Sequence, residues 1–180
     1  MAEPGFPADY AVLGALLDGP AHGYELRRRI AAGLGSIWHI AQSQLYAVLP
    51  RLQRRGLVTC HLQPQGSRPP RKVYALTPAG EQAVRRWAGS PVGHVRDIRV
   101  ELLAKLYFLR RHAPGAAGQL LACQRDRLTR LEHRLARRGV ASDDPLIGRI
   151  ALDFRLRTVR ALLNWIDAAV DELTKEVPDA

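Results

Sequence analysis

Apolar residues in the first third of the chain recur every three or four positions, which is the spacing of amphipathic helices. The pattern predicts three helices, over Tyr10–Leu17, His22–Leu34 and Ala41–Arg55. Asp9 can cap the first of them, and Gly19-Pro20 ends it. The apolar stripe of the third helix consists of Leu45, Val48, Leu49 and Leu52. The rest of that helix is polar, so we expect it to be buried along one side.

The pattern becomes that of β-strands after Gly56. Residues 57–62 and 72–76 predict two antiparallel strands, and the nine residues between them, Q-P-Q-G-S-R-P-P-R, include three prolines. Proline cannot donate to a ladder, so we expect regular pairing to lapse in this turn. Thr77 and Pro78 predict the N-cap and the first position of a fourth helix. The order helix, strand, basic turn, strand and capped helix is that of a winged helix-turn-helix.

Such a unit has one common use, the insertion of a helix into the DNA major groove. The third helix opens on amide and hydroxyl side chains, and glutamine can pair with adenine through two hydrogen bonds. The turn carries arginine and no acid, which suits phosphates or the minor groove. The predicted DNA contacts are Gln42, Ser43, Gln44, Tyr46, Arg51, Arg68, Arg71 and Lys72. The alternatives are an ordinary amphipathic helix and a solubilising loop. We favour DNA binding because the polar helix is followed along the chain by the basic turn.

Three consecutive arginines, Arg27, Arg28 and Arg29, lie in the second predicted helix. Successive helical residues point about 100° apart, so the three cannot all face one partner. Two interpretations stay open: a solvated face, or a phosphate contact made by one of them.

The second half of the chain predicts helices throughout. Residues 89–95 predict a linker, and an amphipathic helix follows from Arg96 to Arg111 until Pro114-Gly115 breaks it. The next helix carries leucines spaced as in a coiled coil, namely Leu121, Leu128, Leu131 and Leu135. A last helix begins after residues 142–145. Its predicted buried side consists of Ile147, Ile150, Phe154, Ala161, Leu162, Trp165, Ala169 and Leu173.

Three such helices carry more apolar surface than one small chain is expected to bury. A second subunit would cover it, and a two-fold DNA site needs two DNA-binding heads. We therefore predict a homodimer whose contacts include Leu121, Leu128, Leu131, Leu135, Phe154 and Trp165. The alternative, a monomeric helical cap, leaves the leucine seam exposed.

Composition agrees with an anionic partner. The 180 residues carry a net charge of +10 with a pI near 10.5, which favours nucleic acid or an anionic membrane surface. No apolar run reaches the roughly 18 residues of a membrane span, and the N-terminus lacks the pattern of a signal peptide. We expect a cytoplasmic protein with no membrane partner. Cys60 and Cys123 are isolated and are interpreted as reduced thiols.

Enzymatic chemistry finds no support in the sequence. Six scattered histidines form neither HxxxH nor HExxH, so no metal site is predicted. Neither a nucleophile elbow nor a nucleotide-binding loop is present, so neither catalytic residues nor cofactors are expected. Trp38, Trp87 and Trp165 are interpreted as core or interface aromatics. The alternative is a flat aromatic ligand stacked on Trp38 or Trp165, in a binding protein whose DNA affinity is incidental.

Three motifs in order resemble the PadR-type transcriptional regulators. They are Y-A-V-L-G-A-L-L-D-G-P-A-H-G-Y-E-L, S-Q-L-Y-A-V-L-P-R-L-Q-R-R-G-L-V and R-K-V-Y-A-L-T-P-A-G, within residues 9–88. The resemblance implies a mainly α-helical protein: a winged helix-turn-helix domain over 1–88, a linker over 89–95 and a helical dimerisation domain over 96–180. It implies a repressor that binds double-stranded DNA as a homodimer on an inverted-repeat operator. It also implies a possible small aromatic effector.

Overall fold

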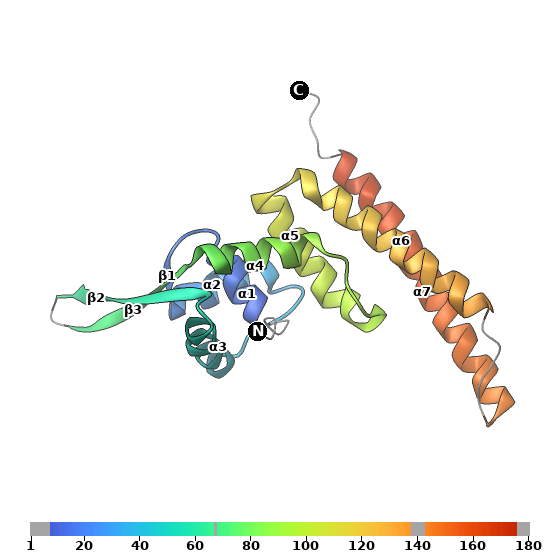
Figure 1. Cartoon of the computed structure of the whole chain (residues 1–180), viewed down its shortest axis with the longest axis horizontal. Helices are drawn as coiled ribbons and strands as arrows, with labels where there is room; N and C mark the ends of the chain where they lie inside the picture. Colours follow the sequence, from blue (N-terminus) through green and yellow to red (C-terminus); the bar gives the residue numbers. More distant parts are fainter. Residues whose placement is uncertain (1–7, 67, 138–142, 176–180) are drawn as a thin grey trace.

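The computed structural model describes residues 8–66, 68–137 and 143–175, and these are mainly helical (Figure 1). A winged-helix head carries a long hairpin at one end and a helical pair at the other. The elements in order are α1 (Ala8–Ala15), β1 (Ala21–His22), α2 (Gly23–Leu34), α3 (Gln42–Arg54), β2 (Val58–Gln65), β3 (Arg68–Leu76), α4 (Pro78–Gly89), η1 (Val95–Asp97), η2 (Ile98–Leu102), α5 (Leu103–His112), α6 (Gly115–Arg137) and α7 (Pro145–Lys175). The predicted fold class is confirmed.

Local hydrogen bonds explain where the helices of the head begin and end. The His22 side chain accepts from the Glu25 backbone N–H and so caps α2. Gly56 follows α3 with φ of 68°, a left-handed conformation that glycine adopts without strain. The Thr77 hydroxyl accepts from the Gly80 N–H, which makes Thr77 the N-cap of α4 as predicted. Thr77 also donates to the Gly56 carbonyl, which ties the end of α3 to the start of α4.

Asp9 has a different role from the predicted helix cap. It lies within α1, its residue is 1% exposed, and its carboxylate forms ion pairs with Arg51 of α3 and with Arg55, the residue that follows the helix. Because a buried carboxylate needs compensating charge, this contact fixes α3 against α1.

The wing is longer than the sequence predicts. The ladder between β2 and β3 continues outward to Gln65 and Arg68, with one irregularity between Gln63 and Gln65. The strands therefore continue past the prolines, but the prediction that regular pairing lapses there is confirmed, because the register skips Pro64, Pro69 and Pro70. Both strands have an open edge near the tip, where a proline nitrogen can face away from its partner strand. A third strand, β1, pairs with β3 at Ala21 and Tyr74 and completes the order β1-β3-β2.

The segment from α4 to α5 is joined to the head by aromatic packing. Trp87 stacks on Tyr10 with ring centroids 4.5 Å apart and meets Phe108 edge-on at 6.3 Å. An added Cβ at Gly14 would lie 2.3 Å from the Phe108 ring, so α1 and α5 approach closely because residue 14 has no side chain.

A buried cation lies beside this aromatic group. Lys105 is 1% exposed, and its Nζ lies 3.0 Å from a Glu101 carboxylate oxygen and 2.7 Å from the Ser90 carbonyl oxygen. The Trp87 indole N–H donates to the same Glu101 carboxylate at 2.9 Å. Burial lowers the pKa of Lys105, and the hydrogen bond and charge of Glu101 oppose that shift. The cluster connects α4 to the η2–α5 segment.

The helices α6 and α7 lie side by side and run in opposite directions (Figure 1). Leu121, Leu128 and Leu135 are buried, and Leu131 is half-buried. Gln124, which interrupts the leucine spacing, accepts a 2.6 Å hydrogen bond from the Val92 backbone N–H. The seam is therefore covered within one chain, and the argument that a monomer leaves it exposed is wrong.

The buried side of α7 is also not the predicted one. Ile147, Ile150 and Phe154 are more than half exposed, and Trp165 is 37% exposed. Ala161 is exposed as well, whereas Leu162, Ala169 and Leu173 pack on the core as predicted. The side that faces α6 instead consists of Leu152, Leu156, Val159, Leu163, Ile166 and Val170. Because α7 is apolar on two opposite sides, its periodicity could not identify the inner one.

Candidate nucleic-acid interface

The outer face of α3 is polar and open. Leu45, Val48, Leu49 and Leu52 are buried as predicted, and Gln42, Ser43, Gln44 and Tyr46 are exposed. The residue that precedes the helix, Ala41, has no side chain that can cap it. The first turn therefore presents side-chain amides and a hydroxyl together with the positive end of the helix dipole.

Helical spacing identifies the side of α3 that lies farthest from the core. Ser43, Ala47, Pro50 and Arg54 follow one another along it, and all four are exposed. Arg54 is not among the DNA contacts predicted from the sequence. Its helical spacing from Ser43, which places both on the same side of α3, could have indicated it. Arg51, which was selected, forms an ion pair with the buried Asp9 and so helps to hold α3 in place.

A hollow of about 600 Å³ lies between α3 and the wing. Tyr46 lies beside the start of α2, because a Cβ added at Gly23 would be 3.0 Å from its ring. Tyr46 and Lys72 come from opposite walls of the hollow, and Tyr24 of α2 borders it. The complete lining is His22, Gly23, Tyr24, Tyr46, Pro50, Gln65, Arg71, Lys72 and Tyr74. The lining includes two cations and no carboxylate, which suits a phosphate backbone that passes beside a helix in the groove.

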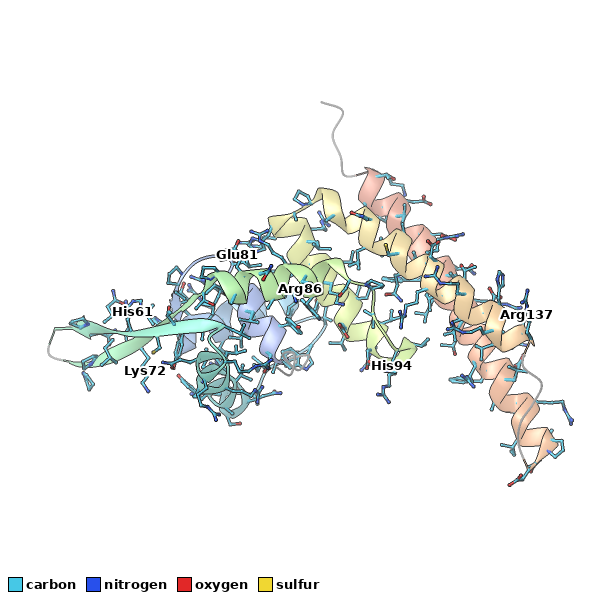
Figure 2. The ribbon with its side chains drawn as sticks, viewed as in Figure 1. His61, Lys72, Glu81, Arg86, His94 and Arg137 are labelled. Atoms are coloured by element: carbon cyan, nitrogen blue, oxygen red, sulfur yellow. The ribbon has the colours of Figure 1, made fainter. Side chains whose placement is uncertain are left out.

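The wing places its charges in defined positions. The Arg71 guanidinium donates to the Gln63 side-chain oxygen at 2.9 Å, across the ladder. Lys72 points to the side of the wing where α3 lies, whereas His61 points to the other side (Figure 2). Arg68 begins β3, but its side chain lies outside the described part of the structure. The Tyr74 side chain at the wing base is buried, and burial, followed by the charge of Cys60, raises its pKa.

The predicted dimer contacts fall into two groups. The leucines of α6 pack within the chain, whereas Phe154 and Trp165 are on the exposed side of α7. That side presents a row of large apolar residues: Leu146, Ile147, Ile150, Phe154 and Trp165. Large apolar side chains exposed on one side of a helix favour an interaction site there.

A cavity of about 330 Å³ lies where the segment 92–98 meets α6 and α7. Its apolar lining includes Leu131 and Phe154, and three arginines also line it: Arg127, Arg134 and Arg155. Neither Trp38 nor Trp165, the tryptophans considered for ligand stacking, belongs to this lining.

Two further properties concern the described residues alone. Over 8–66, 68–137 and 143–175, no three His, Cys, Asp or Glu side chains gather as a metal ion would require. Within the same ranges, no helix combines the length and the apolar character needed to cross a membrane.

An exposed polar helix, held beside an acid-free basic hairpin on a helical core, is the arrangement of a winged helix-turn-helix domain. Residues 12–86 match the family described as "Transcriptional regulator PadR-like family". The negative transcriptional regulator PadR of Bacillus subtilis is 31% identical over 100 residues, which cover 56% of this chain and 55% of that protein. Over residues 12–86 this chain is therefore similar to a family of transcriptional regulators.

Two longer matches accompany this one. A probable transcriptional regulator of Mycobacterium tuberculosis is 24% identical in an alignment 187 residues long, gaps included, and the alignment covers 93% of this chain and 97% of that protein. The crystal structure of B. subtilis PadR in complex with operator DNA has 23% identity and a TM-score of 0.49, and covers 94% of this chain and 99% of that chain. The match to the curated B. subtilis protein spans about half of its length.

Proposed function

We propose that this chain is a repressor that binds double-stranded DNA as a homodimer on an inverted-repeat operator. The observation that carries the proposal is the exposed face of α3 next to a wing that has cations and no carboxylates. In this arrangement the face from Ser43 to Arg54 enters a major groove, and Arg71 and Lys72 hold neighbouring phosphates.

The first experiment is selection of bound fragments from random or genomic DNA, which returns the operator, its symmetry and its half-site spacing together. The purified protein should prefer the selected duplex to bulk DNA. The logarithm of its affinity should fall linearly with the logarithm of salt concentration, with a slope that corresponds to contacts with several phosphates. Equal affinity for all duplexes and for heparin would refute the proposal.

Two substitutions separate base contacts from phosphate contacts. Gln44→Ala should reduce the preference for the operator over a scrambled duplex, whereas Arg71→Ala should weaken both duplexes alike. Arg137→Ala is the matched control, because Arg137 lies at the far end of α6 from the wing (Figure 2). Sequence-independent losses of equal size from Gln44→Ala and Arg71→Ala would show that the assigned roles are wrong.

We infer that the dimer forms through the exposed apolar side of α7. This interface includes Phe154 and Trp165 from the predicted contacts but not the leucines of α6. Burial of this row at a two-fold interface would remove it from water and hold two heads at a fixed spacing. Phe154→Glu should give a monomer in light scattering and reduce affinity for the full operator. Arg149→Glu, on another side of α7, should remain dimeric. A dimeric Phe154→Glu protein would exclude this surface.

The cavity beside segment 92–98 supports a small aromatic effector with an anionic group. Its volume lies at the small end of ligand sites, and its lining combines apolar side chains with three arginines. A ligand there would contact both the segment that leaves the head and the α6–α7 pair, and so could change the separation of the heads. The test measures operator affinity with and without a panel of aromatic carboxylates. Leu131→Trp, which places a larger side chain in the cavity, is measured in the same way. The effector site is contradicted if no compound changes operator affinity and if Leu131→Trp does not change it either.

A further inference from the structure

The three consecutive arginines of α2 have different environments. Arg29 is used inside the head: its guanidinium donates to the Glu25 carboxylate at 2.6 Å and to the Gly19 carbonyl at 2.8 Å. The hydrogen bond from Arg29 to the Glu25 carboxylate is the main cause that lowers the pKa of Glu25. Arg27 and Arg28 are exposed. The structure therefore separates one structural arginine from two that remain available at the surface.

Arg27 and Arg28 line a hollow of their own, of about 370 Å³. His39, three residues before the start of α3 in the loop from α2, forms another wall. The complete lining is Tyr24, Arg27, Arg28, Ala31, His39 and Ile40, and it includes no carboxylate. A concave surface lined by two arginines and a histidine favours an anion.

The surface is continuous with the hollow between α3 and the wing. Tyr24 belongs to the lining of both hollows, so it is the border between them. The Arg27 guanidinium lies over the Tyr24 ring, 5.9 Å from its centroid, and this cation–π contact restrains the side chain. A strand of DNA that passes from the first hollow over Tyr24 therefore reaches Arg27 and Arg28 in the second.

We propose that Arg27 and Arg28, beside Tyr24, form a second phosphate-binding surface for operator DNA, next to the N-terminal end of α3. The wing and this surface then hold the backbone at two places, and α3 is oriented between them. Both contacts are made to phosphates, so they set affinity and orientation and carry no sequence information. This inference rests on the proposed DNA-binding function.

The test is the salt dependence of operator affinity, measured by fluorescence anisotropy on the full chain. Each lost phosphate contact reduces the slope of log affinity against log salt by about 0.9. Because the dimer carries each substitution twice, Arg27→Ala and Arg28→Ala should each reduce the slope by about 1.8, which makes the affinity about 12-fold less sensitive to a fourfold rise in salt. The ratio of operator to scrambled-duplex affinity should stay at the wild-type value. Arg27→Lys and Arg28→Lys should restore most of the slope, because they retain the charge.

Two further variants keep the result interpretable. Arg137→Ala removes one charge far from α3 and should leave the slope unchanged. Arg29→Ala should lower the thermal midpoint, because it breaks contacts within the head. Wild-type slopes for both Arg27→Ala and Arg28→Ala, or the same slope change for Arg137→Ala, would overturn this surface while the wild-type operator preference stands. If wild type has no operator preference, the proposed function itself fails.

Discussion

Replacement of Lys105 by methionine should destabilise the protein strongly, because it leaves the Glu101 carboxylate without its cation. The Ser90 carbonyl also loses the donor that lies 2.7 Å away. Breaking a buried pair by removing one partner costs about 3–5 kcal/mol. For a chain of 180 residues, where 1 kcal/mol shifts Tm by about 2–4 °C, the expected fall in Tm is about 6–20 °C.

The ion pair as a whole should contribute little net stability. Burial is the largest influence on the Lys105 pKa and lowers it below 10.5, and Glu101 reverses this shift only in part. The folded protein therefore binds this proton less readily than the unfolded chain does. Stability from this group is complete above pH 10.5 and is lost as the pH falls through the folded-state pKa. At neutral pH the charged form of Lys105 is thus a cost to the fold.

Replacement of both partners should accordingly rescue the single variant. In Lys105→Met with Glu101→Gln, the glutamine carbonyl can still accept from the Trp87 indole, and no charge remains buried. Its stability in guanidinium unfolding, followed by circular dichroism, should equal or exceed that of the wild type. The exposed Lys175→Met is the control and should change stability by no more than about 0.5 kcal/mol. The reasoning is refuted if Lys105→Met loses under about 1 kcal/mol, or if the double variant is as unstable as the single one.

Gly80→Ala should cost about 1–3 kcal/mol or more, because its Cβ would lie 1.9 Å from a backbone carbonyl oxygen, whereas Gly89→Ala meets nothing within 4 Å. Denaturation of the two proteins side by side checks this, and equal effects would contradict the packing at α4. Burial lowers the pKa of His112 more than Asp18 raises it, so stability is complete above pH 6.5 and falls as the pH drops through the folded-state pKa. The thermal midpoint should fall from about pH 8 to pH 5 and should fall less in His112→Gln, and parallel curves would argue against this cause. Leu128→Ala should cost about 2–5 kcal/mol yet leave a dimer in light scattering, and a stable monomer would instead assign the leucine seam to the subunit interface.

The sequence predicted the elements whose signals are local. Gly56, Thr77 and Pro78 define the boundaries of the head because each acts within a few residues of its own position. The stripe from Leu45 to Leu52 likewise fixes which side of α3 is exposed, and with it most of the candidate DNA contacts. The head and the recognition face could therefore be predicted without coordinates.

Other features depend on contacts that local sequence patterns do not encode. The pairing of Asp9 with Arg51 joins residues 42 positions apart, so nothing near either residue indicates it. The strand β1 has two residues, which is too short for an alternating pattern. Both sides of α7 are apolar, so only the position of α6 decides which side is buried. The roles of Arg27 and Arg29 differ for the same reason, because only tertiary contacts distinguish adjacent arginines.

The proposed dimer would make the DNA-binding activity depend on the concentration of the protein. If two subunits associate through the exposed row on α7, DNA-competent pairs increase with the square of subunit concentration whenever the chain is scarcer than its dissociation constant. Halving expression would then remove three quarters of the functional pairs. The concentration of DNA-competent protein then depends on subunit concentration twice as steeply, on logarithmic scales, as it would for a monomer that binds DNA, even without a small-molecule effector.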